Sequence, residues 1–304
     1  MKIVVIGAGA MGSLFGALLA ESGADVWLYD IWEEHVKAVN EKGLGIELDD
    51  KIRLVSVNAT TDKRQIGKTD LAIIFVKSTQ TGDAAKTASE LMGNNSFVLT
   101  LQNGMGNADV IGEVIDPGRI IVGTTSHGAT MLGPGSIRHA GTGPTVIGMW
   151  SGIQKIGIDK IADAFNKAGI ITETVDDVQN VIWAKLLVNV GINAITALTG
   201  IKNGRILDLS VTKALSRAAI KEAMEVAEAQ GVEIRCDIME HVFKVAEATR
   251  VNRSSMGQDV DNKRQTEIGA INGAVVKEAQ KLGIHVPVNQ TLTALIETLQ
   301  AHYE

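Results

Sequence analysis

In the first half of the chain, short apolar runs rich in β-branched residues alternate with stretches of helical spacing. Apolar runs bounded by turn residues are typical of strands, and apolar positions that recur every three or four residues are typical of helices. The predicted strands are KIVVIG from Lys2, DVWLY at Asp25–Tyr29, and residues 52–57, 71–76, 97–101 and 171–175. The predicted helices cover residues 13–23, 79–92 and 156–168. This alternation predicts a doubly wound parallel sheet.

Residues 123–148 interrupt this pattern, because they are rich in Gly and Pro and contain only short β runs between turns. Such a segment predicts an antiparallel extension of the sheet. His127 and His139 lie in it. We interpret both as structural residues, because no carboxylate or second ligand is spaced to orient them for acid–base chemistry.

From Val178 onward the spacing is helical throughout. The predicted helices cover residues 181–198, 211–230, 239–248, 261–282 and 289–302. Gly231 and Gly283 follow runs of helix formers, as residues that cap a helix C-terminus do. We therefore predict two domains, an α/β domain at 1–176 and an all-α domain at 177–304.

The first of these helices carries a polar stripe within an almost wholly apolar segment, VIWAKLLVNVGINAITAL. Lys185, Asn189 and Asn193 recur at i, i+4 and i+8, which places all three on one helical face. Buried without partners, they would cost several kcal/mol in total. Neighbouring protein groups are the ordinary partners of a single such residue. Three in register, one of them a lysine whose pKa burial can lower, favour a ligand site.

The N-terminus contains a glycine motif. Residues 3–20 carry no charge and resemble a membrane helix or a signal segment by length. The glycines argue against both, since the motif Gly7-Ala8-Gly9-Ala10-Met11-Gly12 follows a strand and begins a helix. In this context the first glycine allows a tight turn, the second the close approach of a pyrophosphate and the third close packing of helix on strand. The free N–H groups of the helix then face the phosphates.

Three further residues bear on a dinucleotide. Asp30 ends the second strand, where an acid that binds the adenosine ribose belongs, and its charge would repel a ribose phosphate, which favours NAD(H). Lys77 follows the strand LAIIFV and either reaches such a phosphate or is an ordinary surface lysine. Asn103 follows the strand at 97–101 and is expected at the nicotinamide end of the cleft, although an asparagine before glycine is also a common turn residue.

Composition and charge limit the classes of partner and of metal or disulfide site that the chain can have. The chain has 304 residues, of which 45% are hydrophobic and 21% charged, with a net charge of −6 and well mixed acids and bases. This argues against nucleic acid or an anionic membrane as a partner. Cys236 is the only cysteine, so no intramolecular disulfide is expected, and no zinc-ligand spacing or other metal site is predicted. We expect a cytoplasmic protein.

Four separate motifs between residues 101 and 273 carry a family resemblance. They are LQNGMGN from Leu101, WAKLLVNVGINA from Trp183, NRSSMGQD from Asn252 and RQTEIGAING from Arg264. Taken singly, Ser254 or Ser255 could cap a helix and Glu267 could pair with Arg264. Together the motifs resemble the ketopantoate reductase (2-dehydropantoate 2-reductase) family over essentially the whole chain.

The resemblance implies a Rossmann domain followed by an all-α domain of the 6-phosphogluconate-dehydrogenase-like type. It implies that Lys185 is the catalytic general acid, held and kept protonated by Glu267. It places the remaining matched residues around the nicotinamide and the substrate, between the two domains: Asn103, Asn189, Asn193 and Ser255, with Asn252 nearby. The family usually binds NADP(H), and many members carry an arginine just past the second strand. This chain has Asp30-Ile31-Trp32 there, which favours NAD(H).

The expected reaction is hydride transfer from NAD(P)H to the keto carbon of ketopantoate, giving pantoate for pantothenate and coenzyme A synthesis. Asn189 and Asn193 are expected to bind the substrate hydroxyl and Ser255 its carboxylate, with Asn103 bridging substrate and cofactor. Two alternatives stay open: a related reductase of another branched 2-oxo acid or an imine, and a non-catalytic nicotinamide-sensing protein. Retention of Lys185 with Glu267 argues against the latter. The partner is a small molecule, and analogy with such folds suggests a homodimer.

Overall fold

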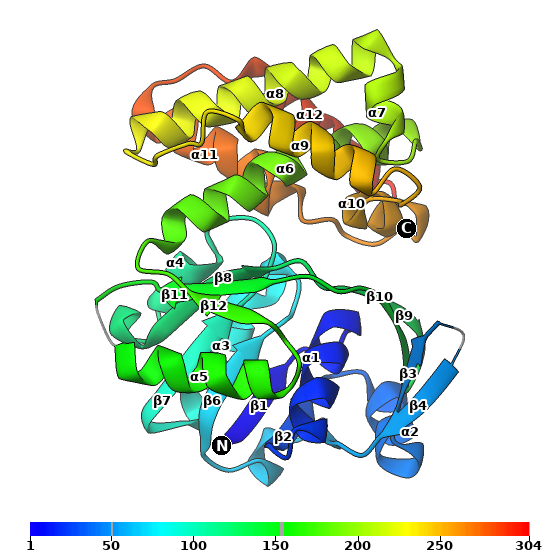
Figure 1. Ribbon diagram of the computed structural model, residues 1–304, viewed down its shortest axis with the longest axis vertical. Coiled ribbons are helices and arrows are strands. Elements are labelled where there is room, and N and C mark those ends of the chain that lie inside the picture. The colour runs from blue at the N-terminus through cyan, green and yellow to red at the C-terminus, as the bar shows by residue number, and fades with distance from the viewer. Residues whose placement is uncertain (50, 153–154, 304) are drawn as a thin grey trace. The chain divides into compact units, whose positions relative to one another are not determined.

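The computed structural model describes residues 1–49, 51–152 and 155–303 (Figure 1). The chain divides into two compact units, of which the first comprises Met1–Gln102 and Asn107–Val178, and the second comprises Asn103–Gly106 and Gln179–Glu304. We expected a boundary after Asp176. The division after Val178 lies two residues beyond it, and no sequence pattern indicated that the four residues at 103–106 would group with the second unit.

The first unit contains an eight-stranded sheet with the order β12-β11-β8-β7-β6-β1-β2-β5. Its strands are β1 (Lys2–Ile6), β2 (Asp25–Tyr29), β5 (Asn58–Thr60), β6 (Thr69–Ile74), β7 (Met92–Thr100), β8 (Ile120–Thr125), β11 (Thr145–Met149) and β12 (Thr172–Thr174). All neighbours are parallel except β8 and β11. The chain passes from β1 to both sides of the sheet, so the predicted doubly wound topology is confirmed, and β1 lies at the switch point where ligands bind in such sheets.

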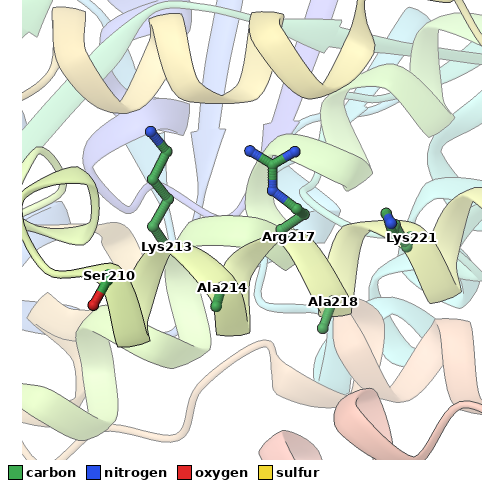
Figure 2. Close-up of a pocket in the computed structure, with 6 residues that line it drawn as sticks. All are labelled: Ser210, Lys213, Ala214, Arg217, Ala218 and Lys221. Atoms are coloured by element: carbon green, nitrogen blue, oxygen red, sulfur yellow. The ribbon is translucent and has the colours of Figure 1, made fainter.

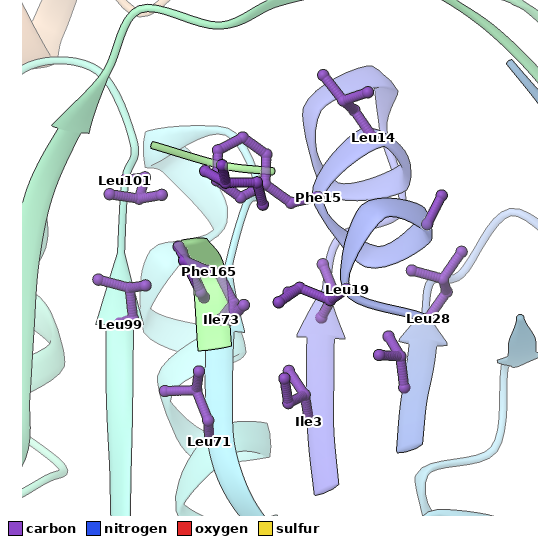
Figure 3. Close-up of a cluster of buried hydrophobic side chains, with 14 of the residues drawn as sticks. Ile3, Leu14, Phe15, Leu19, Leu28, Leu71, Ile73, Leu99, Leu101 and Phe165 are labelled. Atoms are coloured by element: carbon purple, nitrogen blue, oxygen red, sulfur yellow. The ribbon is translucent and has the colours of Figure 1, made fainter. Parts of the chain in front are cut away.

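Helices pack on the strands of this sheet. They are α1 (Ala10–Glu21), α2 (Glu33–Lys42), α3 (Thr81–Leu91), α4 (Asn107–Gly112) and α5 (Lys155–Lys167), with short 3-10 turns η1 (Lys63–Gln65), η2 (Ser78–Gln80) and η3 (Pro117–Arg119). Figure 3 shows side chains of α1 and α5 meeting those of the central strands, and the Phe15 and Phe165 rings lie 5.9 Å apart. Burial of each such side chain contributes about 1.5–3 kcal/mol, so this layer holds the start of α1 firmly against β1.

One sequence prediction for this unit is wrong, and a second is confirmed only in part. The strand predicted at 52–57 corresponds to β4 (Lys51–Val55), which lies in a separate four-stranded sheet of order β4-β3-β10-β9, with β3 at Leu44–Leu48, β10 at Ser136–Gly141 and β9 at Gly128–Gly133. Ile52 and Leu54 point to the face opposite Lys51 and Arg53, and both are exposed, so β4 lacks the buried apolar face that strands of the main sheet have. The segment 123–148 extends the main sheet antiparallel only through β11, because β9 and β10 belong to the smaller sheet.

Among the described residues, the second unit contains helices joined by loops and no strand. Its helices are α6 (Val178–Thr199), α7 (Arg205–Asp208), α8 (Ser210–Ala229), α9 (Ile238–Ala248), α10 (Ser255–Asp261), α11 (Asn272–Leu282) and α12 (Pro287–Gln300), with a 3-10 turn η4 at Ile268–Ala270. The helix α6 passes close to α8 at Gly191, where a Cβ would lie 2.7 Å from the Ile220 side chain. The set of helices in this unit confirms the predicted all-α domain.

The continuous helix predicted at 261–282 is wrong. The helix α10 ends at Asp261, Lys263 has a φ of 51°, and the chain is not helical again until η4 and α11. A left-handed residue costs roughly 1–2 kcal/mol and cannot continue a right-handed helix, which the apolar spacing alone did not reveal. The interruption places Glu267 immediately before η4 rather than in the middle of a long helix.

The helix α6 is long and apolar enough to cross a membrane, with a mean hydropathy of 1.7 in its most apolar window. However, 61% of that window is buried inside the structure. A core helix passes the same test of length and composition, so this signal is weak evidence for a membrane span. Trp183, Leu187 and Val190 of this helix are fully buried in the core of the second unit.

Candidate functional site

The glycine-rich loop between β1 and α1 is shaped by packing at two glycines and left open at the third. Gly7 has a φ of +96°, and a Cβ there would lie 2.8 Å from the Val76 side chain. A Cβ on Gly12 would lie 1.9 Å from the carbonyl oxygen of Gly7, whereas a Cβ on Gly9 would meet nothing within 4 Å. Gly7 and Gly12 thus allow the turn and the close helix packing, and space remains beside Gly9.

The helix α1 begins with Ala10 and Met11. Its N-cap is Gly9, and no side chain caps it. Its first turn contains no acidic residue. The first N–H groups of a helix have no partner within the helix, and the helix dipole adds partial positive charge there. This end of α1 therefore presents the donors that a phosphate requires, which fits the pyrophosphate of a dinucleotide.

Asp30 lies directly beside this loop. Its Oδ2 accepts a hydrogen bond of 2.6 Å from Ala8 N, and its Oδ1 accepts one of 2.9 Å from Trp32 N. A carboxylate has about four acceptor positions, and these two bonds use two of them. Asp30 thereby joins the end of β2 to the glycine-rich loop, and its predicted contact with a ribose stays a prediction.

Lys77 follows the strand next to β1. The strands β6 and β1 run parallel, and Phe75 N donates to the Ile6 carbonyl at 2.9 Å, so Lys77 lies two residues beyond the same carboxyl edge. It is partly buried and is the N-cap of η2. Its predicted contact with a ribose phosphate stays a prediction.

In the second unit, the polar stripe of α6 includes unpaired buried amides. Asn193 is 5% exposed, and the Nδ2 atoms of Asn189 and Asn193 are both buried without a hydrogen-bond partner. An unsatisfied buried donor costs about 1–3 kcal/mol, so the two amides favour a partner that is not part of the protein, although Trp183 Nε1 of the same helix is also unpaired. The positions are those of the stripe that the sequence singled out.

Lys185, one turn before Asn189, has a perturbed ammonium group. Burial lowers the pKa of Lys185 to about 8, and the negative charge of Glu267 acts in the opposite direction. The two residues are 82 positions apart in the sequence, and the break between α10 and α11 brings them together. A lysine with this pKa is present as both ammonium and amine near neutral pH, which suits proton transfer.

Asn103 also contacts Glu267. Its Nδ2 donates to Glu267 Oε2 at 3.3 Å, and Glu267 is only 9% exposed. The following residues bind the η4 segment, since Met105 N donates to the Ala270 carbonyl at 2.8 Å and Gly104 approaches the same carbonyl closely. The loop at 103–106 is therefore attached to the segment that carries Glu267.

Asn252 and Ser255 are both exposed. The backbone of Asn252 is bonded on both sides, through its N–H to the Thr249 carbonyl and through its carbonyl to Asn203 N. Ser255 is the first residue of α10. Their predicted contacts with a substrate stay predictions.

The sequence indicated Ser254 as a possible helix cap, which the structure confirms, but sequence reasoning missed Thr196 as its partner. Ser254 is the N-cap of α10 and accepts from Gly257 N at 3.0 Å, and its hydroxyl is 2.7 Å from that of Thr196. Thr196 lies three residues after Asn193, so the stripe of α6 extends by one more turn. That spacing was visible in the sequence. The hydroxyl pair fixes Ser255 relative to the amides of α6.

His127 and His139 form a pair of their own in the first unit. Nδ1 of His127 and Nε2 of His139 are 3.3 Å apart, and burial lowers the pKa of both rings. Neutral rings that bond each other fit the structural role that we predict for them.

A surface hollow of about 360 Å³ lies along α8 (Figure 2). It is lined by Ser210, Lys213, Ala214, Arg217, Ala218 and Lys221. The cations of Lys213 and Arg217 lie 5.6 and 5.5 Å from the centre of the Phe243 ring. None of the site residues predicted from the sequence lines this hollow.

Comparison with known families gives two matches along the chain. Residues 3–152 match the model of the family described as ketopantoate reductase PanE/ApbA, and residues 177–300 match that of its C-terminal domain. Together the two matches cover most of both units.

Curated relatives and solved structures match over nearly the full length. The 2-dehydropantoate 2-reductases of Halobacterium salinarum and Pyrococcus abyssi are 38% and 40% identical, over 99% of this chain and 99% and 98% of theirs. A PanE/ApbA family ketopantoate reductase from Ralstonia eutropha is 33% identical with a TM-score of 0.92, over 100% of this chain and 99% of that one. A D-mandelate dehydrogenase with NADH and anilino(oxo)acetate is 28% identical with a TM-score of 0.94, at the same coverage.

Proposed function

The chain belongs to the ketopantoate reductase PanE/ApbA family, and on this premise we propose that it is a 2-dehydropantoate 2-reductase, which reduces ketopantoate to pantoate with a nicotinamide dinucleotide. One observation carries the proposal. A lysine with a pKa near 8, held beside a buried carboxylate, shares a helical face with two buried amides whose Nδ2 atoms have no partner. In the family's reaction class these groups supply a proton and bind a polar substrate. The product then serves pantothenate and coenzyme A synthesis.

The dinucleotide is bound by the first unit in this proposal. The residues that would hold it are Gly7, Gly9, Ala10, Met11, Gly12, Asp30 and Lys77. The open space beside Gly9 and the uncapped N-terminus of α1 support this, because they match the bulk and charge of a pyrophosphate. When bound, the reduced nicotinamide supplies the hydride that the keto carbon accepts.

Lys185 supplies the proton. As negative charge develops on the carbonyl oxygen, the ammonium of Lys185 hydrogen-bonds that oxygen and donates its proton to it. A positioned general acid contributes on the order of 10²- to 10⁴-fold. Glu267 supports this role, since its negative charge opposes the fall in the pKa of Lys185 that burial causes and so preserves the ammonium.

The amides of α6 bind the substrate hydroxyl. Asn189 and Asn193 each offer an unpaired N–H donor, and an amide can donate and accept without adding charge to a site that already holds Lys185 and Glu267. Ser255 binds the substrate carboxylate, and Asn103, whose amide Glu267 orients, contacts the substrate as well.

We propose NADH as the preferred coenzyme. The Asp30 carboxylate has two positions left for ribose hydroxyls and would repel a phosphate on the same ribose. No arginine follows Asp30 directly. The similar D-mandelate dehydrogenase structure contains NADH. The family default is NADP(H), and Lys77 is the residue that would accommodate its phosphate.

A second candidate function is the reduction of a different 2-oxo acid. The high structural similarity to D-mandelate dehydrogenase with anilino(oxo)acetate favours it, since that ligand contains an oxo group beside a carboxylate and an aromatic substituent. The stripe on α6 distinguishes the two candidates. Two amide donors fit a substrate with a hydroxyl, whereas an aromatic substituent would leave them unpaired.

A spectrophotometric assay tests these proposals together. Oxidation of NADH and of NADPH is followed in parallel with ketopantoate, its analogue without the hydroxyl, pyruvate and phenylglyoxylate. The proposed function predicts the highest kcat/KM with ketopantoate and a loss of tenfold or more for the analogue without the hydroxyl, of the order that an unpaired buried donor imposes. A preference for phenylglyoxylate would support the second candidate. Absence of hydride transfer with all four acids would favour the nicotinamide-sensing alternative.

A further inference from the structure

The first unit contains a fully buried histidine to which no role has yet been given. His35 lies on α2 and is 0% exposed. Gly135 N donates to its Nδ1 at 3.0 Å, and its Nε2 is 3.2 Å from the hydroxyl of Ser13. That hydroxyl in turn donates to the Ala8 carbonyl at 2.8 Å. His35 therefore connects a turn of the small sheet to the glycine-rich loop.

The direction of these bonds follows from the donor at one end. A backbone N–H only donates, so Nδ1 of His35 accepts and the hydrogen of the neutral ring is on Nε2. Nε2 then donates to Ser13 Oγ, whose own hydrogen goes to the Ala8 carbonyl. Burial lowers the pKa of His35, which agrees with a neutral ring, and the smaller effect of the Asp30 carboxylate acts in the opposite direction.

The backbone of Ala8 is consequently held on both sides of its Cα atom. Ser13 bonds its carbonyl oxygen, and the Asp30 carboxylate accepts its N–H at 2.6 Å. The residues Ala8, Gly9 and Ala10 have no polar side chains that could fix the loop themselves. Its conformation therefore depends on groups supplied by α1, α2 and the end of β2.

The far end of this connection is rigid. Gly135 lies in the turn between β9 and β10 with a φ of +72°, and a Cβ there would lie 2.8 Å from that of Ala38 on α2. Its carbonyl accepts from Gly45 N at 2.9 Å. The small sheet is thus attached closely to α2 at the point where His35 accepts its hydrogen bond. The Trp32 ring stacks on His35 with centres 5.3 Å apart.

We propose that His35 is a positioning residue for the dinucleotide: through Ser13 it holds the glycine-rich loop in the conformation in which the N-terminus of α1 and Asp30 bind the ligand. The proposal rests on the dinucleotide binding of the proposed function, and His35 itself touches no ligand. It also assigns a purpose to the four-stranded sheet, which is to hold α2 and its histidine against α1.

The test measures the Kd for NADH and NADPH by quenching of tryptophan fluorescence, with kcat measured separately at saturating coenzyme. His35→Leu removes both ring bonds, and Ser13→Ala removes the link to Ala8. Each variant is expected to raise the Kd roughly tenfold, the effect of one or two lost hydrogen bonds, while kcat stays within about twofold. The Kd of the double variant should not exceed that of the single variant with the higher Kd, because both substitutions break the same connection.

Two further variants sharpen the test. His35→Gln keeps a donor near the position of Nε2 and should recover most of the affinity. Ser22→Ala is the matched control, because the Ser22 hydroxyl donates to the Leu19 carbonyl at 2.7 Å, a bond of the same kind at the other end of α1. Its Kd should equal that of the parent.

A purely structural role for His35 has a different signature. It would lower the Tm of His35→Leu and of Ser13→Ala without changing either Kd below the transition, and that result overturns the proposal. If His35→Leu does not fold, Ser13→Ala decides alone. Failure of the parent protein to bind either coenzyme would instead contradict the proposed function, so the two failures are distinguishable.

Discussion

The side-chain amide of Asn103 donates a hydrogen bond of 3.3 Å to Glu267 Oε2, although the two residues are 164 positions apart in the sequence. The same carboxylate opposes the fall in the pKa of Lys185 that burial causes. Glu267 thus interacts with an amide from the loop at 103–106 and with the ammonium on α6. One buried acid orients the first group and maintains the charge of the second.

Replacing Lys185 should remove proton donation and leave coenzyme binding intact. For Lys185→Ala we expect turnover to fall on the order of 10²- to 10⁴-fold, the usual contribution of a general acid, with an unchanged Kd for the coenzyme. Steady-state kinetics and fluorescence titration measure the two quantities. Lys202→Ala, which removes a lysine shortly after the end of α6, is the control and should keep full turnover. A turnover of Lys185→Ala within threefold of the parent would rule out the general-acid role.

The pH dependence of ketoacid reduction should report the pKa of Lys185. The general acid must be protonated, and burial lowers this pKa to about 8, so kcat/KM should fall as the pH rises above that value. In Glu267→Gln the opposing negative charge is lost, and the pKa of Lys185 falls further. The alkaline limb should then move to lower pH by roughly one unit or more. An unmoved limb would show that Glu267 does not set the protonation of the catalytic group.

We expect that Asn193 contributes to substrate binding and lowers the stability of the fold. In Asn193→Leu an unpaired buried donor is removed, so the Tm should stay equal or rise while the KM for the substrate increases at least tenfold, since an unsatisfied donor costs about 1–3 kcal/mol. Asn289→Leu is the matched control in the same unit. Asn289 is fully buried and paired with Ala219, Glu222 and Asn272, so its replacement should lower the Tm clearly. A lower Tm for Asn193→Leu would mean that protein groups pair with this amide.

Much of the fold followed from periodicity. The central parallel strands β1, β6 and β7 contain continuous apolar runs, and the helices of the second unit have long stretches of helical apolar spacing, so both gave a clear signal. The four-stranded sheet gave no such signal in the sequence. The strand β4 forms an antiparallel hairpin with its sequence neighbour β3, and β3 pairs in parallel with the distant strand β10 instead of joining the main sheet. Such pairings between distant segments leave no local pattern in a sequence.

The candidate site was predictable where it repeats along one helix. Lys185, Asn189 and Asn193 are separated by whole turns, and the amide donors of the two asparagines are buried and unpaired as a ligand site requires. The grouping of Asn103 with Glu267 needed the family resemblance, because it depends on the break after Asp261 and on a loop that joins the second unit. His35 gave no signal, since one histidine on an amphipathic helix resembles any other.

The charge of Asp30 should control coenzyme choice. Asp30→Asn keeps an acceptor for the backbone of the loop but no longer repels a ribose phosphate, so the preference for NADH over NADPH should narrow by roughly tenfold or more. Parallel kcat/KM measurements with the two coenzymes check this. Asp25→Asn changes the same charge at the opposite end of β2 and should leave the ratio unaltered. Equal discrimination by Asp30→Asn and the parent would show that other residues select the coenzyme.

The loop at 103–106 provides a test of how Asn103 is held. Gly104 and Gly106 both have positive φ, of 83° and 89°, so an alanine at either position costs about 1–2 kcal/mol of backbone strain. Only at Gly104 would the added Cβ collide, since the Ala270 carbonyl lies where it must go, whereas at Gly106 it meets nothing within 4 Å.

The comparison of these two alanine variants isolates the collision from the strain. Gly104→Ala must separate the loop from η4, and because Asn103 precedes it directly, the bond to Glu267 should be lost and kcat/KM should fall at least tenfold beyond that of Gly106→Ala. Differential scanning calorimetry and steady-state kinetics on both variants measure this. If the two lose activity equally, the attachment of the loop to η4 has no part in catalysis, and Asn103 acts without the support of Glu267.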